Sequence, residues 1–300
     1  MKNKIELIPV IHMVNINQVL TNVKICTDNG IKKVFLINHH VGVEDMLNCT
    51  TIVKDKYPEL WIGVNMLGVP ATEAIAKNLT GIDGLWCDET LTREDVINHK
   101  VFKGLIFSGL AFKYQPQPED LEHACKEAIR ANVVATTSGS ATGKAADIEK
   151  IKTISKHIGN NPMAIASGVS IDNIHDYFGL VDYLLVASSI TSSQEMIYED
   201  KLKELVKAVK DFENIDISRI INSRYGITGI GSSKYLRFKE SEISENKNVV
   251  FVPWTTRTVK TSIEGENGKH EIWQIYGFEK LKYQVREFLH KIKILKIKYL

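Results

Sequence analysis

The sequence predicts an α/β protein in which residues 1–214 form a (βα)8 TIM barrel and residues 215–300 form a small, basic α+β C-terminal module. Short apolar runs alternate with amphipathic helical stretches eight times, whereas a doubly wound sheet, the alternative, usually ends at about five or six strands. The charge balance changes near residue 214, from 22 Lys+Arg against 27 Asp+Glu to 16 against nine. Pattern and charge therefore predict one domain boundary at the same point.

Eight strands are predicted for the barrel, because each apolar run is short and rich in Val, Ile, Leu or Phe. Continuous apolar runs are typical of parallel strands that are covered on both faces. In order along the chain, the predicted strands are Leu7–Met13, Lys33–Asn38, Trp61–Leu67, Gly84–Glu89, Gly104–Phe112, Val133–Ser138, Met163–Gly168 and Tyr183–Ser188.

Helix start signals lie between the predicted strands. Pro70 stands in the first turn of one helix, and Thr92, which is followed by acidic residues, caps another. Gln117 begins a third helix, and the apolar spacing predicts two more over Asp147–His157 and Tyr198–Phe212.

The alternation of strands and helices stops after residue 214. A turn-forming segment, residues 264–269, separates two strand-like runs and predicts a hairpin. The predicted elements of this module are the strands Val249–Trp254, Thr258–Ile263 and His270–Tyr276, and a final helix over Glu279–Lys298.

Composition is that of an ordinary globular protein and excludes a membrane-spanning one. Apolar residues make up 44% and charged residues 25% of the chain, and no run approaches the roughly 18–20 apolar residues of a membrane span. The four cysteines are scattered without metal-binding spacing, so we expect buried free thiols and a cytoplasmic protein. They are Cys26, Cys49, Cys87 and Cys125.

Polar side chains gather where the apolar strands end, which is the face that carries the active site in TIM barrels. His12 interrupts the first apolar run, Asn38 and His39 end the second, and Asn65 ends the third. We expect Asn38, His39 and Asn65 to bind substrate and His12 to take part in catalysis or orient the substrate. A structural role is the alternative for His12.

Asp88 and Glu89 end the fourth strand as a pair of carboxylates. Burial could raise the pKa of one of them enough for acid–base catalysis, whereas Glu89 could instead cap the next helix. Lys113 follows the long fifth strand and could form a Schiff base or bind phosphate, with a plain surface position as its alternative. Asp88, Glu89, Lys113 and His12 are therefore the candidate catalytic residues.

Small residues and hydroxyls follow strands six to eight and favour phosphate binding. The segment TSGSATGK after the sixth strand lets the backbone approach a ligand, but it lacks the spacing of a P-loop. Loops after strands seven and eight usually bind phosphate in this fold, assisted here by a helix that we expect at Asp172 and Asn173. The candidate phosphate ligands are Gly139, Ser140, Thr142, Gly143, Gly168, Ser188 and Ser189, and Ser138 is a candidate substrate-binding residue.

The sequence predicts no cofactor and no dedicated metal site. A divalent metal is the alternative, because His12, His39, His40 and Asp88 could supply mixed nitrogen and oxygen ligands. Adjacent histidines point in different directions, which argues against His39 and His40 acting as a metal-binding pair.

Several of these segments resemble the BtpA family. The runs TSGSATGKAADIEKIKTI, PMAIASGVSIDNI and DYLLVASSI carry the resemblance most specifically, and WIGVNML is similar to the family's third strand. PVIHMVN is similar to its opening segment, and Lys113 matches the lysine of its fifth strand. The similarity covers about residues 5–212 and departs from the family's usual residues at His12, Asn15 and Ala187. It implies a barrel from a superfamily rich in phosphate-binding enzymes, with a link to photosystem I biogenesis for some members.

Together these features predict an enzyme that acts on a phosphosugar, a ribosyl phosphate or a nucleotide-like compound. Isomerase, lyase and glycosidic hydrolase chemistry all fit the candidate residues. The alternative is a non-enzymatic binding or assembly factor whose basic C-terminal run, KIKILKIKYL, contacts a partner or a membrane surface. A homo-oligomer fits either hypothesis, and the modest charge surplus without a recognised motif argues against nucleic acid.

Overall fold

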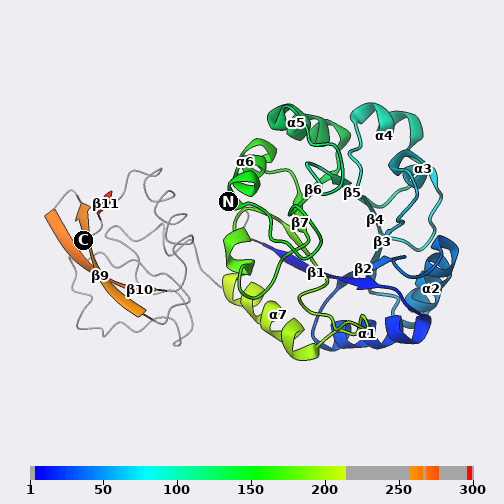
Figure 1. Ribbon diagram of the computed structural model, residues 1–300, viewed down its shortest axis with the longest axis horizontal. Coiled ribbons are helices and arrows are strands. Elements are labelled where there is room, and N and C mark those ends of the chain that lie inside the picture. The colour runs from blue at the N-terminus through cyan, green and yellow to red at the C-terminus, as the bar shows by residue number, and fades with distance from the viewer. Residues whose placement is uncertain (1–3, 214–256, 266–267, 277–295, 299–300) are drawn as a thin grey trace. The chain divides into compact units, whose positions relative to one another are not determined.

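The computed structural model describes residues 4–213, 257–265, 268–276 and 296–298 (Figure 1). The chain divides into two compact units, residues 1–209 and residues 210–300.

Eight parallel strands of the first unit close into a barrel in the order of the sequence, which confirms the predicted (βα)8 fold (Figure 1). The first strand pairs with the second, Val10 opposite Phe35, and with the eighth, Leu7 opposite Leu184, so the sheet has no free edge. The strands are β1 (Glu6–His12), β2 (Lys33–Ile37), β3 (Trp61–Asn65), β4 (Gly84–Cys87), β5 (Leu105–Gly109), β6 (Val134–Ser138), β7 (Met163–Ala166) and β8 (Tyr183–Val186).

Helices surround the strands as an outer ring (Figure 1). They are α1 (Ile16–Asp28), α2 (Val43–Lys56), α3 (Ala71–Ala76), α4 (Arg93–His99), α5 (Leu121–Ala131), α6 (Ile148–Ile158) and α7 (Glu199–Glu213). The helix expected at Asp172 and Asn173 is instead a single 3-10 turn, η1 (Ile174–Tyr177), because the Asn173 side chain is bonded back to Gly168 and Ser170. None of the described helices is long and apolar enough to cross a membrane.

Side-chain caps determine where three of the predicted helices begin. Thr92 and Asp95 form a capping box at α4, in which each side chain accepts a hydrogen bond from the backbone N–H of the other residue. Asp147 caps α6. The third helix begins later than Gln117, because the Asp120 carboxylate accepts from the N–H of His123 and so starts α5.

Aromatic rings fill the interior of the barrel. Phe35 lies edge-on to Trp61 and to Trp86, with ring centroids 5.4 and 5.7 Å apart. Glycines in the neighbouring strands make room for these rings, since a Cβ at Gly63 would lie 2.3 Å from Phe35 and one at Gly84 would lie 2.2 Å from Trp61. The barrel is therefore a packed core, and its ligand site must lie at an end of the strands.

The four cysteines of the barrel are buried free thiols, as the sequence predicts. Burial raises the pKa of Cys26 and Cys87 to about 12 and the pKa of Cys49 and Cys125 to about 11. Thiols with such pKa values are protonated at neutral pH and are poor nucleophiles. The candidate chemistry therefore lies elsewhere in the barrel.

The described part of the second unit is an antiparallel sheet in the order β10–β9–β11. Strands β9 (Arg257–Gly265) and β10 (Gly268–Tyr276) form the predicted hairpin. Strand β11 (Lys296–Lys298) pairs with β9, which corrects the end of the helix predicted over Glu279–Lys298. Lysine and isoleucine alternate there with a period of two, which suits a strand. The predicted strand Val249–Trp254 and residues 277–295 lie outside the described residues.

Candidate functional site

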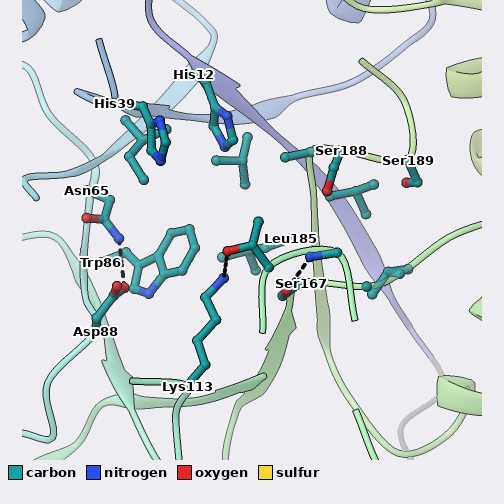
Figure 2. A pocket seen from close by; sticks show the side chains of 18 of the residues that line it. His12, His39, Asn65, Trp86, Asp88, Lys113, Ser167, Leu185, Ser188 and Ser189 are labelled. Carbon is teal, nitrogen blue, oxygen red and sulfur yellow. Dashed lines mark hydrogen bonds between the residues drawn. The ribbon is translucent and has the colours of Figure 1, made fainter. Parts of the chain in front are cut away.

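A cavity of about 490 Å3 opens at the C-terminal ends of the barrel strands (Figure 2). Its volume lies in the range typical of small-molecule sites, which is roughly 300–1,000 Å3. Ten predicted site residues line it, namely His12, His39, Asn65, Asp88, Lys113, Thr142, Gly143, Gly168, Ser188 and Ser189. The loops after the strands thus bring these distant residues to one cavity.

An acid and an amine stand at the ends of β4 and β5. The Asn65 amide donates to Asp88 Oδ1 at 3.0 Å, and the Lys113 amine donates to Thr142 Oγ1 at 3.2 Å (Figure 2). Burial raises the pKa of the Asp88 carboxyl, while the Asn65 hydrogen bond and the Lys113 charge oppose that shift. Burial also lowers the pKa of the Lys113 amine, opposed by the charge of Asp88. Both pKa values therefore shift in the direction of neutral pH. Shifts in this direction favour proton transfer between these groups and a substrate.

Two histidines form another wall of the cavity (Figure 2). The rings of His12 and His39 are stacked, with centroids 4.9 Å apart and planes inclined by 13°. Burial lowers the pKa of His39, and the nearby His12 and His40 rings lower it further. A neutral His39 ring could donate a hydrogen bond to a ligand or accept one from it, without adding charge to the cavity.

Glu195, which the sequence analysis did not single out, lies beside these histidines. Its Oε1 is 3.2 Å from His12 Nδ1 and 3.6 Å from His40 Nε2. The buried amides of Gln18 and Asn22 on α1 donate to the Glu195 carbonyl at 2.7 and 2.8 Å and so fix the loop after β8. Helix α1 thus holds the backbone of the residue whose carboxylate lies beside His12.

Hydroxyl and glycine residues form the side of the cavity across from Asp88 (Figure 2). The Gly143 N–H donates to Ser167 Oγ at 3.2 Å, and that hydroxyl donates to the Ala141 carbonyl at 3.0 Å, which ties the loop after β6 to the loop after β7. Ser189 Oγ is buried and has no hydrogen-bond partner among the described residues. That hydroxyl is therefore available to a ligand.

Two glycines of the predicted phosphate segment are required by packing within the protein. A Cβ at Gly139 would lie 2.0 Å from the Lys144 carbonyl oxygen, and a Cβ at Gly168 would lie 2.1 Å from the same atom. Gly168 also has a φ of +72°, which favours glycine. Because these residues have no side chain, the loops after β6 and β7 can pack closely against each other. Gly139 and Gly168 therefore shape the cavity through backbone packing.

Five predicted site residues lie outside the lining of this cavity: Asn38, Glu89, Ser138, Gly139 and Ser140. Asn38 bonds to both backbone atoms of Leu67, and Glu89 accepts from the Ala71 N–H at 2.7 Å, so it caps α3 and not the following helix. Ser138 is fully buried and accepts from the Lys113 N–H at 2.8 Å. Asn38, Glu89 and Ser138 thus hold the loops of the site in place.

Lys150 on α6 is a further supporting residue that the sequence analysis missed. Its amine donates to the carbonyls of Ala111 and Ser138, at 2.5 and 3.0 Å, and so joins the ends of β5 and β6. Burial lowers the pKa of this amine. Trp86 and Tyr114 also line the cavity, and Trp86 could have been found because it precedes Asp88 by two residues and so shares its face of β4.

Among the described residues, no group of three or more His, Cys, Asp and Glu side chains is arranged to hold a metal ion. His12, His39 and His40 lie close together, but their rings stack or meet edge-on. His12 Nδ1 also lies 3.2 Å from Glu195 Oε1.

Fold and cavity together define the first unit as a TIM barrel with a cavity at the C-terminal ends of its strands. Residues 106–211 match the model of the BtpA family. This match runs from β5 to α7 and confirms the resemblance where the sequence motifs are most specific, in strands six to eight.

Three solved structures share the barrel fold and match 98% of their own length. They are a native KDPGal structure (TM-score 0.55, 14% identity, 71% of this chain), a thiamine phosphate pyrophosphorylase from Pyrococcus furiosus (0.51, 12%, 70%) and a phosphoribosyl anthranilate isomerase from Thermus thermophilus (0.51, 10%, 69%). At these identities the similarity establishes the fold alone. No curated protein matches the chain.

Proposed function

We propose that the barrel is an enzyme that acts on a phosphorylated small molecule: a phosphosugar, a ribosyl phosphate or a nucleotide-like compound. The loops after β6, β7 and β8 bind the phosphate together with Lys113, and the reacting part of the substrate lies beside Asp88. The observation that carries this proposal is a cavity with hydroxyls and glycine backbone on one side, a partly buried acid on the other, and a partly buried amine that reaches the hydroxyl side.

Charge supports this orientation of the substrate. The Lys113 amine points toward the loop after β6, where it bonds to Thr142, so it can pair with a phosphate held by that loop. Burial raises the pKa of the Asp88 carboxyl, a shift in the direction that suits a group exchanging a proton with the substrate. Isomerase, lyase and glycosidic hydrolase reactions each need such a group.

Two of the structurally similar proteins bear names that refer to phosphorylated compounds, thiamine phosphate pyrophosphorylase and phosphoribosyl anthranilate isomerase. They support the proposal through the shared barrel, whose loops after strands seven and eight often bind phosphate. The Ser188 and Ser189 hydroxyls occupy the corresponding loop here.

Thermal unfolding with and without ligand tests the proposal. Ribose 5-phosphate or a nucleoside 5′-monophosphate at about 100 times its Kd should stabilise the protein by about 2.7 kcal/mol and raise Tm. No rise in Tm with any phosphosugar or nucleotide, up to millimolar concentrations, would contradict the proposal.

Lys113→Met should weaken the binding of the phosphorylated ligand by roughly 10- to 100-fold, because it removes a charge-assisted hydrogen bond. Lys103→Met is the matched control, since Lys103 is exposed and precedes the opposite end of β5. Equal ligand affinity in the two variants, measured by calorimetry, would show that Lys113 does not bind the ligand.

A further inference from the structure

A second cavity of about 300 Å3 adjoins the first at the ends of β3 and β4. Asn65, Leu67, Trp86 and Asp88 line both cavities. Figure 2 shows Asn65, Trp86 and Asp88 together on one side of the first cavity, across from Ser188 and Ser189. Asp88 therefore stands at the junction of two spaces that a single ligand could occupy.

The two cavities differ in charge. Lys113 lines the first, whereas the charged residues that line the second are both acidic, Asp88 and Glu89. Glu89 is held in place there by the N–H of Ala71. A phosphate is attracted to the first cavity and repelled from the second, so the orientation of a two-part ligand is determined by charge.

The second cavity otherwise has a mixed lining, in which polar surface exceeds apolar surface. Met66, Leu67, Val69 and Pro70 follow one another along its wall. Because its two carboxylates have no cationic side chain beside them among the lining residues, this cavity favours a neutral group over an anionic one.

Trp86 adds a hydrogen-bond donor at the junction. Its side chain is only 7% exposed, and its Nε1 has no hydrogen-bond partner among the described residues. Buried N–H groups are normally paired, so an unpaired donor at a cavity wall points to an acceptor atom on the ligand. The neutral group in the second cavity should therefore carry an acceptor such as a ring nitrogen or a carbonyl oxygen.

We infer that the substrate has two parts: a phosphorylated part in the first cavity, and a neutral group with a hydrogen-bond acceptor in the second. The linkage between the two parts then lies beside Asp88 and Asn65. This inference rests on the proposed function and narrows it, since a phosphosugar alone would fill only the first cavity. Nucleoside 5′-monophosphates are suitable probes because they join a neutral or nearly neutral ring to a sugar phosphate.

Calorimetric titration of the full-length protein compares ribose 5-phosphate with four nucleoside 5′-monophosphates. At least one nucleotide should bind about tenfold more tightly than ribose 5-phosphate. Val69→Trp places a large side chain in the second cavity from a partly exposed position. It should abolish the gain in affinity of the nucleotide over ribose 5-phosphate, and it should change the Kd of ribose 5-phosphate less than about twofold. Ile97→Trp is the matched control on the exposed face of α4 and should retain the gain.

Trp86→Phe provides a second test that keeps an aromatic ring in place and removes the N–H donor together with part of the indole ring. It should reduce the gain in affinity for the nucleotide by about threefold or more. The inference is overturned if ribose 5-phosphate binds and no nucleotide binds more tightly, a result that leaves the proposed function intact. A gain that persists in Val69→Trp would also overturn it, and failure of every ligand to bind would overturn both proposals.

Discussion

Asp88 combines a pKa raised by burial, a hydrogen bond from Asn65 and a position beside both cavities. It accepts from Asn65, stands at the end of β4 and lines both cavities. Burial raises the pKa of its carboxyl, so the folded protein disfavours the charged form relative to the unfolded chain. Such a carboxyl costs stability at neutral pH, and active sites commonly bear costs of this kind.

Asp88→Asn should therefore increase the free energy of unfolding at pH 7, by about 0.5–2 kcal/mol, the range typical of single stabilising substitutions. The cost of the charge is absent below the unfolded pKa, about 3.9, and grows as the pH rises toward the folded pKa, so the gain should shrink near pH 4. Urea unfolding at both pH values measures it, with the exposed Asp55→Asn as control. A variant less stable than the wild type at pH 7 would contradict this account of Asp88.

Residues at the strand ends could be predicted because the C-terminal ends of parallel barrel strands must meet at one face. His12, Asn65, Asp88 and Lys113 were found in this way. Glu195 was not, because it reaches His12 only through the contacts of its loop with α1, far away in the sequence. Sequence spacing carries no signal for such a tertiary contact.

The loops after β6 and β7 act as one unit, joined by the bonds of Ser167 and by the close approach of Lys144 to two glycines. This arrangement holds Gly143 and Gly168 on the same wall of the cavity. The affinity of the site for phosphate should therefore depend on backbone packing as well as on side-chain hydroxyls.

Gly168→Ala should destabilise the protein by about 1–3 kcal/mol more than Gly159→Ala, because its new Cβ would collide with the Lys144 backbone. Gly159 is a matched control: it also has a positive φ, +61°, but nothing lies within 4 Å of a Cβ built there. Chemical denaturation measures both changes. Equal losses would show that φ alone, and not loop packing, determines the cost.

Strands were predicted more accurately than helices for a physical reason. Each buried parallel strand is a short apolar run bounded by polar residues, so its position is visible in the sequence. The end of β5 was placed too late, because Leu110–Phe112 continues the apolar run although Ala111 turns the chain with a φ of +48°. The 3-10 turn η1 follows a local hydrogen bond from Asn173 to Gly168, whereas the strand β11 depends on its pairing with β9.

For the whole molecule, the barrel unit contains the complete closed sheet and every residue that lines the two cavities. Its helix α7 ends at Glu213 and precedes the second unit's described strands. We therefore expect the barrel to fold and bind ligand without residues 214–300.

A chain of residues 1–213 should keep a cooperative thermal transition, with a Tm within about 3 °C of that of the full chain. Its Kd for a phosphorylated ligand should change less than about twofold. Circular dichroism and calorimetry make the comparison. A truncated chain that folds but loses ligand binding would assign part of the site to the second unit.

The central claim is that the loops after β6, β7 and β8 bind the phosphate of the substrate. A crystal structure of the protein soaked with ribose 5-phosphate tests it most directly. The account predicts the phosphorus atom between Gly143, Gly168 and Ser188, with a phosphate oxygen about 2.7 Å from Ser189 Oγ. A well-ordered ligand whose phosphate lies elsewhere, or an empty cavity at saturating ligand concentration, would contradict it.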